Sequence, residues 1–376
     1  MGYTKRAIHG ISWMGAFRTV SRIVSLARII VLARILTPAQ FGIFGIASLV
    51  LSLLEIIAET GINTFLIQEK RDIKSYINSA WVISIARGCI IAILIIISSP
   101  FIAFFFDSSE VYPLVLLVGV VPLIRGFINP SIVRFQKELE FNKEFFMRLA
   151  IFLLDSAVAV VLAISTRSVV SFVWGLIAGA LLEVLLSFVF IKPLPRLEFN
   201  FSIVKKILHK GKWVTLSGIF NYLAQEGDDI VVGKILGTTS LGIYQMGYKL
   251  ATLPISEISD VINKVAFPVF AKISDDRDRL FHAFKKTTFL IFVTSMIGGG
   301  IIFFLPREFF ISLLGSQWNK VVDIIHILVI YGIIRSISGH SSALFLGVGR
   351  QDFVAGITFL RFSTLIIFVI PLTLVF

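Results

Sequence analysis

The chain has 376 residues, of which 56% are hydrophobic and 15% are charged, and its net charge is +12. Because about a quarter of the residues of a typical soluble domain carry a charge, this composition excludes that class. The positive charge alone would suggest a nucleic-acid-binding protein. The basic residues gather in turns between apolar segments, however, so nucleic acid is not an expected partner.

Apolar stretches of about twenty residues recur from the amino terminus onward, the length that a helix needs to cross the hydrocarbon core of a membrane. Backbone polar groups in lipid must bond internally, and the sequence lacks the alternating pattern of a barrel, so these stretches are predicted to be α-helices. The expected fold is an all-α polytopic membrane protein with eleven transmembrane helices. They are predicted over residues 12–34, 41–66, 80–106, 111–133, 146–165, 168–191, 213–236, 241–268, 284–305, 321–346 and 353–376.

Residues recur at an offset of 200 positions, which indicates two similar bundles around a central cavity. The basic segment 192–212 would link an amino-terminal six-helix lobe, 1–191, to a carboxyl-terminal lobe, 213–376. With five predicted helices, the second lobe is expected to lack its last helix or helices. The repeated positions include Trp13 and Trp213, Ile30-Val31 and Ile230-Val231, Ile35 and Ile235, Gly42 and Gly242, and Asn63 and Asn263.

Lysines and arginines lie mainly in the turns on one side of the predicted helices. The opposite turns hold few, such as Arg167, Arg307 and Lys320. The positive-inside rule then predicts a cytoplasmic amino terminus. The basic turns are Lys70–Lys74, Arg134–Arg148, Lys192–Lys212 and Lys272–Lys286.

The run Leu32-Ala33-Arg34-Ile35-Leu36-Thr37-Pro38-Ala39-Gln40-Phe41-Gly42 resembles a hallmark of bacterial polysaccharide flippases. These proteins belong to the multidrug/oligosaccharidyl-lipid/polysaccharide exporter superfamily. Asp228–Gly237 and Pro130–Phe141 are similar to that family as well, and the resemblance covers essentially the whole chain. It implies two six-helix lobes with a central cavity in the bacterial cytoplasmic membrane. It also implies transport of an undecaprenyl-pyrophosphate-linked sugar repeat to the outer face.

The first predicted helix carries Arg18, Arg22 and Arg28 on one face, together with Ser21 and Ser25. An arginine near the bilayer centre costs roughly 2.5–3.5 kcal/mol even on the lenient insertion scale, so this face is expected to meet water, partner groups or an anion. Guanidinium groups suit phosphate because they donate planar, bidentate, charge-assisted hydrogen bonds. The alternative is pairing with buried carboxylates, for which the candidates are Glu55, Glu59 and Asp228.

Other polar groups would extend this path. Lys249 belongs to a polar stripe on helix 241–268 that also holds Ser259 and Asn263. Arg125 and Arg335 occupy comparable places in the fourth and tenth helices, with snorkelling to lipid headgroups as the alternative. We therefore expect the polar helices to line the cavity. The intramembrane carboxylates have two possible roles, which are coupling of transport to protons or sodium and simple ion pairing with basic residues. Beyond Glu55, Glu59 and Asp228, these carboxylates include Asp155, Glu183, Asp229 and Glu257.

Motifs of an enzyme are missing from the sequence. No Gly-rich phosphate-binding loop ends in Lys-Ser/Thr, which argues against ATP hydrolysis. The five histidines lack metal-ligand spacing, and the single cysteine, Cys89, excludes a disulfide framework. No catalytic residue, cofactor or metal is expected.

Three functions are compatible with these observations. The first is a flippase for lipid-linked oligosaccharide that works by alternating access. The second is a multidrug cation antiporter of the same superfamily, whose site would be dominated by carboxylates and aromatics. The third is a non-transporting membrane scaffold of a polysaccharide-assembly complex. Expected partners are the lipid-linked oligosaccharide, membrane lipids, and polysaccharide polymerase and glycosyltransferase proteins.

Overall fold

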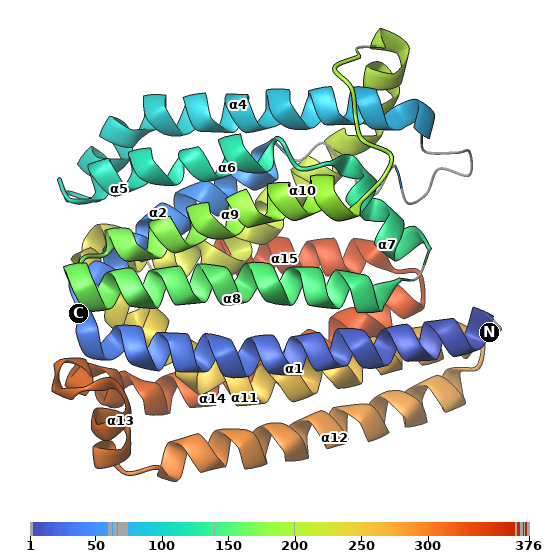
Figure 1. Cartoon of the computed structure of the whole chain (residues 1–376). Coiled ribbons are helices and arrows are strands. Elements are labelled where there is room, and N and C mark those ends of the chain that lie inside the picture. The colour runs from blue at the N-terminus through green and yellow to red at the C-terminus, as the bar shows by residue number, and fades with distance from the viewer. Residues whose placement is uncertain are drawn as a thin grey trace. The chain divides into compact units, whose positions relative to one another are not determined.

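The computed structural model describes residues 3–58, 62, 66, 74–138, 140–198, 200–364, 367–368, 371 and 373, and the regular elements of this part are helices (Figure 1). Two compact units, Met1–Tyr222 and Leu223–Phe376, divide inside helix α10 (Phe201–Ile235). The predicted segment 192–212 is not a loop throughout, because α10 already begins at Phe201. The lobe boundaries at 191 and 213 remain a prediction.

The first unit contains a layer in which α1 lies along α8 and α8 along α9, and a second group in which α4 packs on α5 and α6. Helix α6 also contacts α9 and thereby joins the two groups. Before α10, the elements are α1 Tyr3–Ile35, α2 Pro38–Ile57, α4 Lys74–Phe105, α5 Val111–Val118, α6 Val120–Arg125, η1 Pro130–Val133, α7 Arg134–Lys137, α8 Phe141–Thr166 and α9 Val170–Phe190.

The second unit is built around α11, which packs against both α12 and α14, while α14 also contacts α15. Its apolar core gathers side chains such as Ile255, Ile325 and Val329. After α10, the elements are α11 Gly237–Lys272, α12 Arg277–Phe304, α13 Arg307–Leu314, η2 Ser316–Trp318, α14 Asn319–Gly347 and α15 Gln351–Thr364.

A helix occurs in each of the eleven predicted spans, but fewer meet the requirements for crossing lipid. Six of the described helices are long and apolar enough, or up to seven if Val111–Arg125 and Pro130–Lys137, bent by 73°, form one span. The predicted count of eleven is higher than this. Helices α1, α10 and α11 differ from the six in carrying charged or polar faces, which lower their hydropathy.

The α1–α2 junction shows why the motif Thr37-Pro38-Ala39-Gln40 ends one helix and begins the next. Thr37 Oγ1 accepts a hydrogen bond from Gln40 N at 3.3 Å, and Gln40 Oε1 accepts one from Thr37 N at 2.9 Å. This is a capping box, with Pro38 at the first helical position. Gln40 Nε2 also donates to Arg167 O at 3.0 Å, which fixes the junction to the α8–α9 turn.

The offset of 200 holds for helix ends, since α1 ends at Ile35 and α10 at Ile235. Each is followed within three residues by the next long helix, α2 from Pro38 and α11 from Gly237. The repeat seen in the sequence is therefore a repeat of the helix–turn–helix unit.

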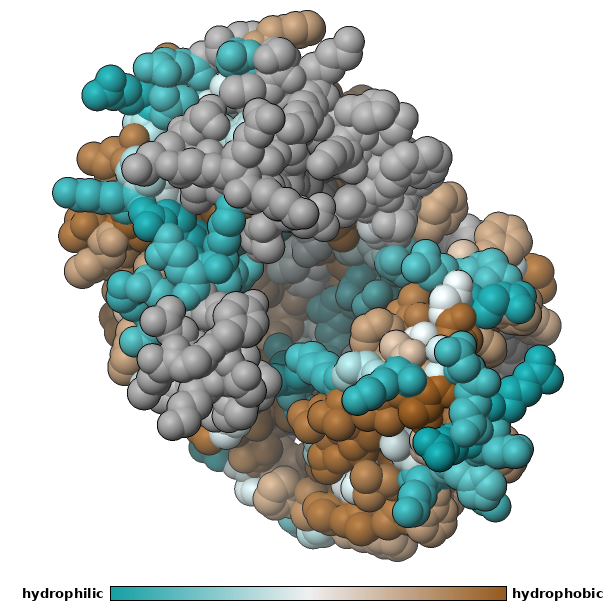
Figure 2. Space-filling model, turned by 90° about the vertical axis from the view of Figure 1, so that its right-hand side faces the viewer, coloured by the Kyte–Doolittle hydropathy of each residue, from teal (hydrophilic) through white to brown (hydrophobic). Residues whose placement is uncertain are grey.

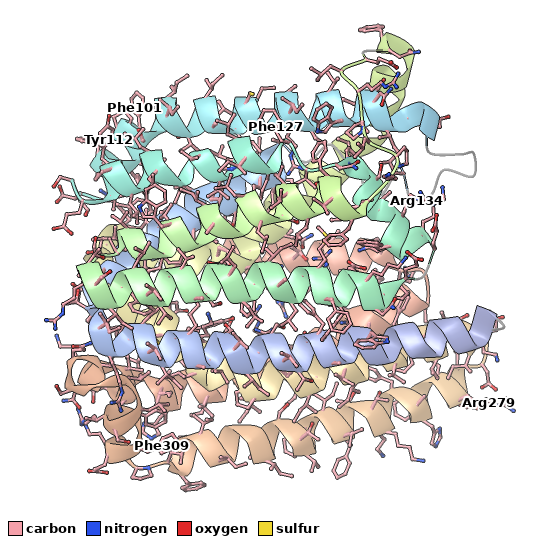
Figure 3. All side chains as sticks on the ribbon, in the orientation of Figure 1. Phe101, Tyr112, Phe127, Arg134, Arg279 and Phe309 are labelled. Atoms are coloured by element: carbon pink, nitrogen blue, oxygen red, sulfur yellow. The ribbon has the colours of Figure 1, made fainter. Side chains whose placement is uncertain are left out.

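Labelled aromatic residues and arginines lie at opposite ends of each unit. In the first unit Phe101 and Tyr112 lie at one end and Arg134 at the other; in the second, Phe309 and Arg279 are likewise at opposite ends (Figure 3). Hydrophilic side chains gather at the ends that carry the arginines (Figure 2). The cytoplasmic position of the arginine-bearing ends remains a prediction.

Helices α4 and α6 approach closely at Gly88, which gives a test of the packing. A Cβ at Gly88 would lie 2.4 Å from the Pro122 carbonyl oxygen, a backbone atom that cannot rotate away. We expect Gly88→Ala to lower the free energy of unfolding by about 1–3 kcal/mol, through overpacking. The measurement is the unfolding midpoint of the purified protein in detergent.

The matched control is Gly300→Ala on α12, where the added Cβ has open space among the described residues. Alanine has the higher helix propensity, so this change should be neutral or stabilising by up to about 1 kcal/mol. Equal midpoints for the two variants would contradict the packing of α4 on α6.

Candidate functional site

Arg28, predicted to bind an anion, forms a buried ion pair with Asp155 of α8. Its Nη1 donates to Asp155 Oδ2 at 2.9 Å, and both side chains are 13% exposed. The guanidinium carbon also lies 5.8 Å from the centroid of the Phe172 ring on α9. The partner is therefore none of the carboxylates suggested from the sequence, and Glu59 lies outside the described residues.

Glycine on α9 makes room for this ion pair. A Cβ at Gly175 would lie 2.6 Å from both the backbone oxygen and Oδ1 of Asp155. Oδ1 has no hydrogen-bond partner among the described residues. The ion pair consequently lies where α1, α8 and α9 meet. Asp155 Oδ2 bonds Arg28, and Asp155 Oδ1 lies against the backbone of α9.

Arg18 and Arg22 lie elsewhere on the circumference of α1. With 3.6 residues per turn, they are about 80° and about 120° from Arg28 around the axis. Arg28 faces α8, as do Trp13 and Phe17, whose rings contact Phe145. Arg18 is half-buried and Arg22 is exposed. The three arginines thus spread over about a third of the circumference of α1. On the side of Arg28, α8 packs against α1.

Two other predicted residues, Arg125 and Glu55, are brought together in the first unit. Arg125 Nη1 lies 3.3 Å from Glu55 Oε1, and Arg125 Nε lies 3.9 Å from Glu183 Oε2 on α9. Arg87 of α4 donates from Nη2 to the Glu55 backbone oxygen at 2.9 Å. Arg125 and Glu55 are 39% and 31% exposed, so solvent screens this pair more than the Arg28 pair.

These groups line a cavity of about 300 Å³ inside the first unit. Its innermost acid is Glu144 of α8, which is 4% exposed. Glu144 Oε1 accepts hydrogen bonds from Gln136 Nε2 at 2.9 Å and from Arg148 Nε at 2.8 Å. The lining residues are Glu55, Ile62, Ser84, Arg87, Gly88, Ile91, Pro122, Arg125, Gly126, Ile128, Pro130, Ile132, Val133, Gln136, Glu144, Arg148 and Glu183.

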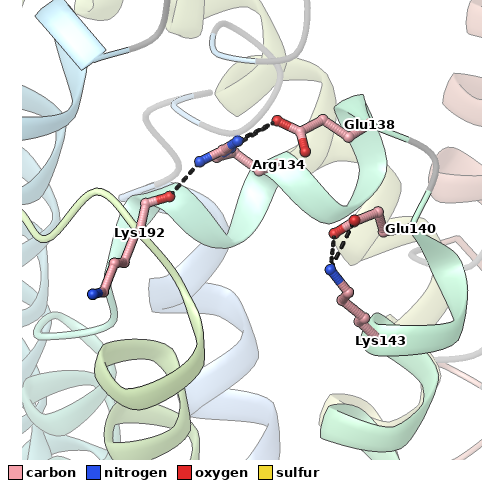
Figure 4. Close-up of polar contacts among 5 residues, drawn as sticks. All are labelled: Arg134, Glu138, Glu140, Lys143 and Lys192. Atoms are coloured by element: carbon pink, nitrogen blue, oxygen red, sulfur yellow. Dashed lines mark hydrogen bonds and ion pairs between the residues drawn. The ribbon is translucent and has the colours of Figure 1, made fainter.

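Pro130, Ile132, Val133 and Gln136 line this cavity, and the segment that carries them is bonded to the end of α9. The buried Asn129 donates from Nδ2 to the backbone oxygens of Ser187 and Ile191 at 3.3 and 3.2 Å. Arg134 donates to Lys192 O at 2.6 Å and to Glu138 at 2.8 Å, and Lys143 bonds Glu140 (Figure 4). Part of the Pro130–Phe141 motif therefore has a structural role.

In the second unit the predicted residues surround an acidic stretch of α10. Asp228 Oδ2 accepts a hydrogen bond from Tyr244 at 2.6 Å. Arg335 of α14 lies within electrostatic range of Asp228, and its guanidinium carbon is 5.6 Å from the centroid of the Tyr248 ring. Lys249 is exposed. Asp228 and Arg335 are therefore near one another.

Part of the polar stripe on α11 is hydrogen-bonded to the neighbouring helix α14. Ser259 hydrogen-bonds Ser336 of α14, and Asn263 Oδ1 lies 2.5 Å from Nδ1 of the fully buried His340, also on α14. His340 Nε2 is 2.7 Å from Thr287 Oγ1 on α12. This end of the stripe fastens helices inside the second unit, because hydroxyl and amide groups there satisfy one another.

For Asp155 and Glu183 the sequence predicted ion coupling or simple pairing, but it identified no partner residue for either. Asp155 and Glu183 were recognisable as carboxylates within apolar helices, which marks them as functional or paired. What they pair with depends on tertiary packing. Glu144 and Arg148 gave no such signal, because they lie in the first turns of α8 in a sequence rich in charges.

Comparison with known proteins supports one family. A family described as "Polysaccharide biosynthesis protein" matches residues 31–323. The chain is 24% identical over 357 residues to the lipopolysaccharide biosynthesis protein WzxC of Escherichia coli (strain K12), covering 94% of this chain and 72% of that protein.

Solved structures share the fold at low sequence identity. The lipid II flippase MurJ in an inward closed conformation has a TM-score of 0.72 at 15% identity, covering 96% of this chain and 82% of MurJ. An inward-facing MATE multidrug resistance transporter of the MOP superfamily has a TM-score of 0.69 at 16% identity, covering 95% and 88%. With its helical fold and its match over most of its length, the chain belongs to the polysaccharide biosynthesis protein family, as an all-helical polytopic membrane protein.

Proposed function

We propose that the protein is a flippase that moves an undecaprenyl-pyrophosphate-linked oligosaccharide across the bacterial cytoplasmic membrane by alternating access. The observation that supports this most is the placement of Arg18 and Arg22 on α1, away from the face that Arg28 presents to α8. A guanidinium at membrane depth is costly unless it meets water, a partner group or an anion, and pyrophosphate suits its planar donors. The amino terminus would be cytoplasmic.

The roles divide among the cationic residues. Arg18 and Arg22 would bind the pyrophosphate, while Arg28 positions α1 through its pair with Asp155. Lys249 and Arg335 of the second unit would extend the cationic path, whereas Arg125 of the first unit pairs with Glu55. Glu55 and Asp228 would balance its charge or couple transport to an ion. The lipid tail would stay in the bilayer, and polymerase and glycosyltransferase proteins would act on the same glycan.

A multidrug cation antiporter is less well supported by the site. Such a protein needs carboxylates available to a cationic cargo. In the first unit Asp155 pairs with Arg28, and both Glu55 and Glu183 lie against Arg125. The likeness to a MATE transporter concerns the fold, so it does not favour this cargo.

The test is transport by the purified chain in proteoliposomes. A fluorescent undecaprenyl-pyrophosphate oligosaccharide should move between leaflets, and the double variant Arg18→Ala/Arg22→Ala should reduce the rate on the order of ten- to a hundred-fold. That range follows from losing charge-assisted hydrogen bonds of about 1.5–3 kcal/mol.

The matched control is Arg279→Ala, whose side chain is 79% exposed and outside the proposed path. It should transport at the rate of the unmodified protein. Wild-type transport by the double variant would reject the assignment of Arg18 and Arg22. Movement of a cationic dye without movement of the lipid would indicate the antiporter, and movement of neither would indicate the scaffold.

A further inference from the structure

The cavity inside the first unit has the size of a small-molecule site. Its volume of about 300 Å³ is at the lower end of the range for ligand pockets. Five helices contribute to it, namely α2, α4, α6, α8 and α9, together with η1 and Gln136 of α7. It belongs entirely to this unit and contains neither Arg18 nor Arg22.

The charges around the cavity are balanced. Among the described residues that line it, Arg87, Arg125 and Arg148 face Glu55, Glu144 and Glu183. A pyrophosphate or a metal cation would favour an excess of one sign, whereas this lining offers charged donors and charged acceptors in equal number. The electrostatics therefore suit a neutral ligand with many polar groups.

Two buried atoms of the lining have unused hydrogen-bonding capacity. Glu144 Oε2 accepts no hydrogen bond and Arg125 Nε donates none among the described residues. The distance of 3.9 Å from Arg125 Nε to Glu183 Oε2 is too long for a hydrogen bond. Both side chains are paired through their other atoms, so these two atoms remain available for hydrogen bonds to a ligand.

A sugar hydroxyl can bond to either atom, because it donates one hydrogen bond and accepts others. The remaining walls are apolar and would contact the C–H groups of a sugar ring; they include Ile91, Ile128 and Ile132. We propose that this cavity binds one uncharged sugar residue of the transported glycan, with Glu144 and Arg125 as its principal polar contacts. This proposal rests on the proposed flippase function.

The decisive variant is Glu144→Gln. Gln136 and Arg148 both donate to the Oε1 position, so the amide oxygen should occupy that position and the NH₂ group the position of Oε2. The variant thus replaces an acceptor by a donor with little change in shape. The lining also gains a net positive charge. Sugar binding should weaken, while any binding of an anion should strengthen.

The measurement is saturation-transfer NMR on the full chain in nanodiscs, with methyl glycosides of neutral hexoses and N-acetylhexosamines, inorganic phosphate and sodium chloride as separate probes. At least one glycoside should bind, about tenfold more weakly to Glu144→Gln, as expected for the loss of one charge-assisted hydrogen bond. The matched control Glu140→Gln, at an acid that bonds Lys143 outside the cavity, should bind as the unmodified protein does.

Three results would overturn the proposal. They are the binding of no glycoside at tens of millimolar to folded protein, equal glycoside binding by Glu144→Gln, and binding of phosphate that strengthens in that variant. The unfolding midpoint of Glu144→Gln in detergent shows whether the variant is folded. A second variant, Arg125→Lys, should also weaken glycoside binding.

Proteoliposomes separate failure of this proposal from failure of the proposed function. If lipid-linked glycan is flipped and Glu144→Gln flips it with unchanged apparent affinity, the sugar subsite is wrong and the flippase stands. If no lipid is flipped while glycosides still bind in a Glu144-dependent manner, the flippase assignment is wrong and the cavity remains a sugar site.

Discussion

Arg28→Ala is expected to lower the free energy of unfolding by about 3–5 kcal/mol, because it leaves Asp155 as an unpaired charge in a buried position. Asp155 is enclosed on its other side by α9, since Gly175 approaches its Oδ1 too closely for an added Cβ. The protein cannot easily admit water there without separating α8 from α9. Chemical unfolding of the purified chain in detergent measures the loss.

The double variant Arg28→Gln/Asp155→Asn distinguishes a structural role from ligand binding. It removes both charges and retains a neutral hydrogen bond across the same positions, so most of the lost stability should return. We also expect it to transport lipid-linked glycan near the wild-type rate, since Arg28 acts by positioning α1. A stable double variant without transport would show that Arg28 itself contacts the substrate. A double variant as unstable as Arg28→Ala would contradict the ion pair.

An exposed pair provides the comparison for this effect. Arg279 lies 3.1 Å from Asp276 with its side chain 79% exposed. Surface ion pairs contribute about 0–1 kcal/mol, so Arg279→Ala should leave the unfolding curve almost unchanged. The difference in unfolding free energy between Arg28→Ala and Arg279→Ala then measures the effect of burial on an ion pair, and not only the effect of removing a charge.

The sequence contained most of the information about helices because their determinants are local. Apolar length identified a helix in every predicted span, and the Thr37-Pro38-Ala39-Gln40 pattern is a cap that can be recognised from residue types and spacing. The offset of 200 correctly related α1 to α10, whose ends differ by that number. The number of membrane-spanning helices was harder to predict than the helices themselves. Helices that carry many charged residues do not meet the apolar criterion that the other spans satisfy.

Pairing partners were not predictable, because they depend on long-range packing. Arg28 and Asp155 are 127 residues apart, and no spacing rule connects them. The periodicity of α11 showed that Ser259 and Asn263 share a face, but it carried no information about which helix covers that face. The partners of these two residues, Ser336 and His340, both come from α14. Helical periodicity shows which residues share a face of one helix, but it does not identify the helix that packs against that face.

His340→Ala should lower the free energy of unfolding by about 3–5 kcal/mol, as for deletion of a large buried ring. The side chain is fully buried and stacks on Phe284 at 5.2 Å between ring centroids. Both ring nitrogens have partners, Asn263 on α11 and Thr287 on α12. The substitution therefore creates a cavity and also leaves two polar groups without their partner.

His340→Phe separates these contributions, because it keeps a ring against Phe284 and removes both hydrogen bonds. It should cost about 1–3 kcal/mol, since each of the two lost hydrogen bonds contributes about 0.5–1.5 kcal/mol. The control on the same helix is Ser338→Ala, an exposed position where the effect should stay within about 0.5 kcal/mol. All three are measured by unfolding in detergent. If His340→Phe were as stable as the unmodified protein, the hydrogen bonds would contribute nothing, and packing alone would hold α11, α12 and α14 together.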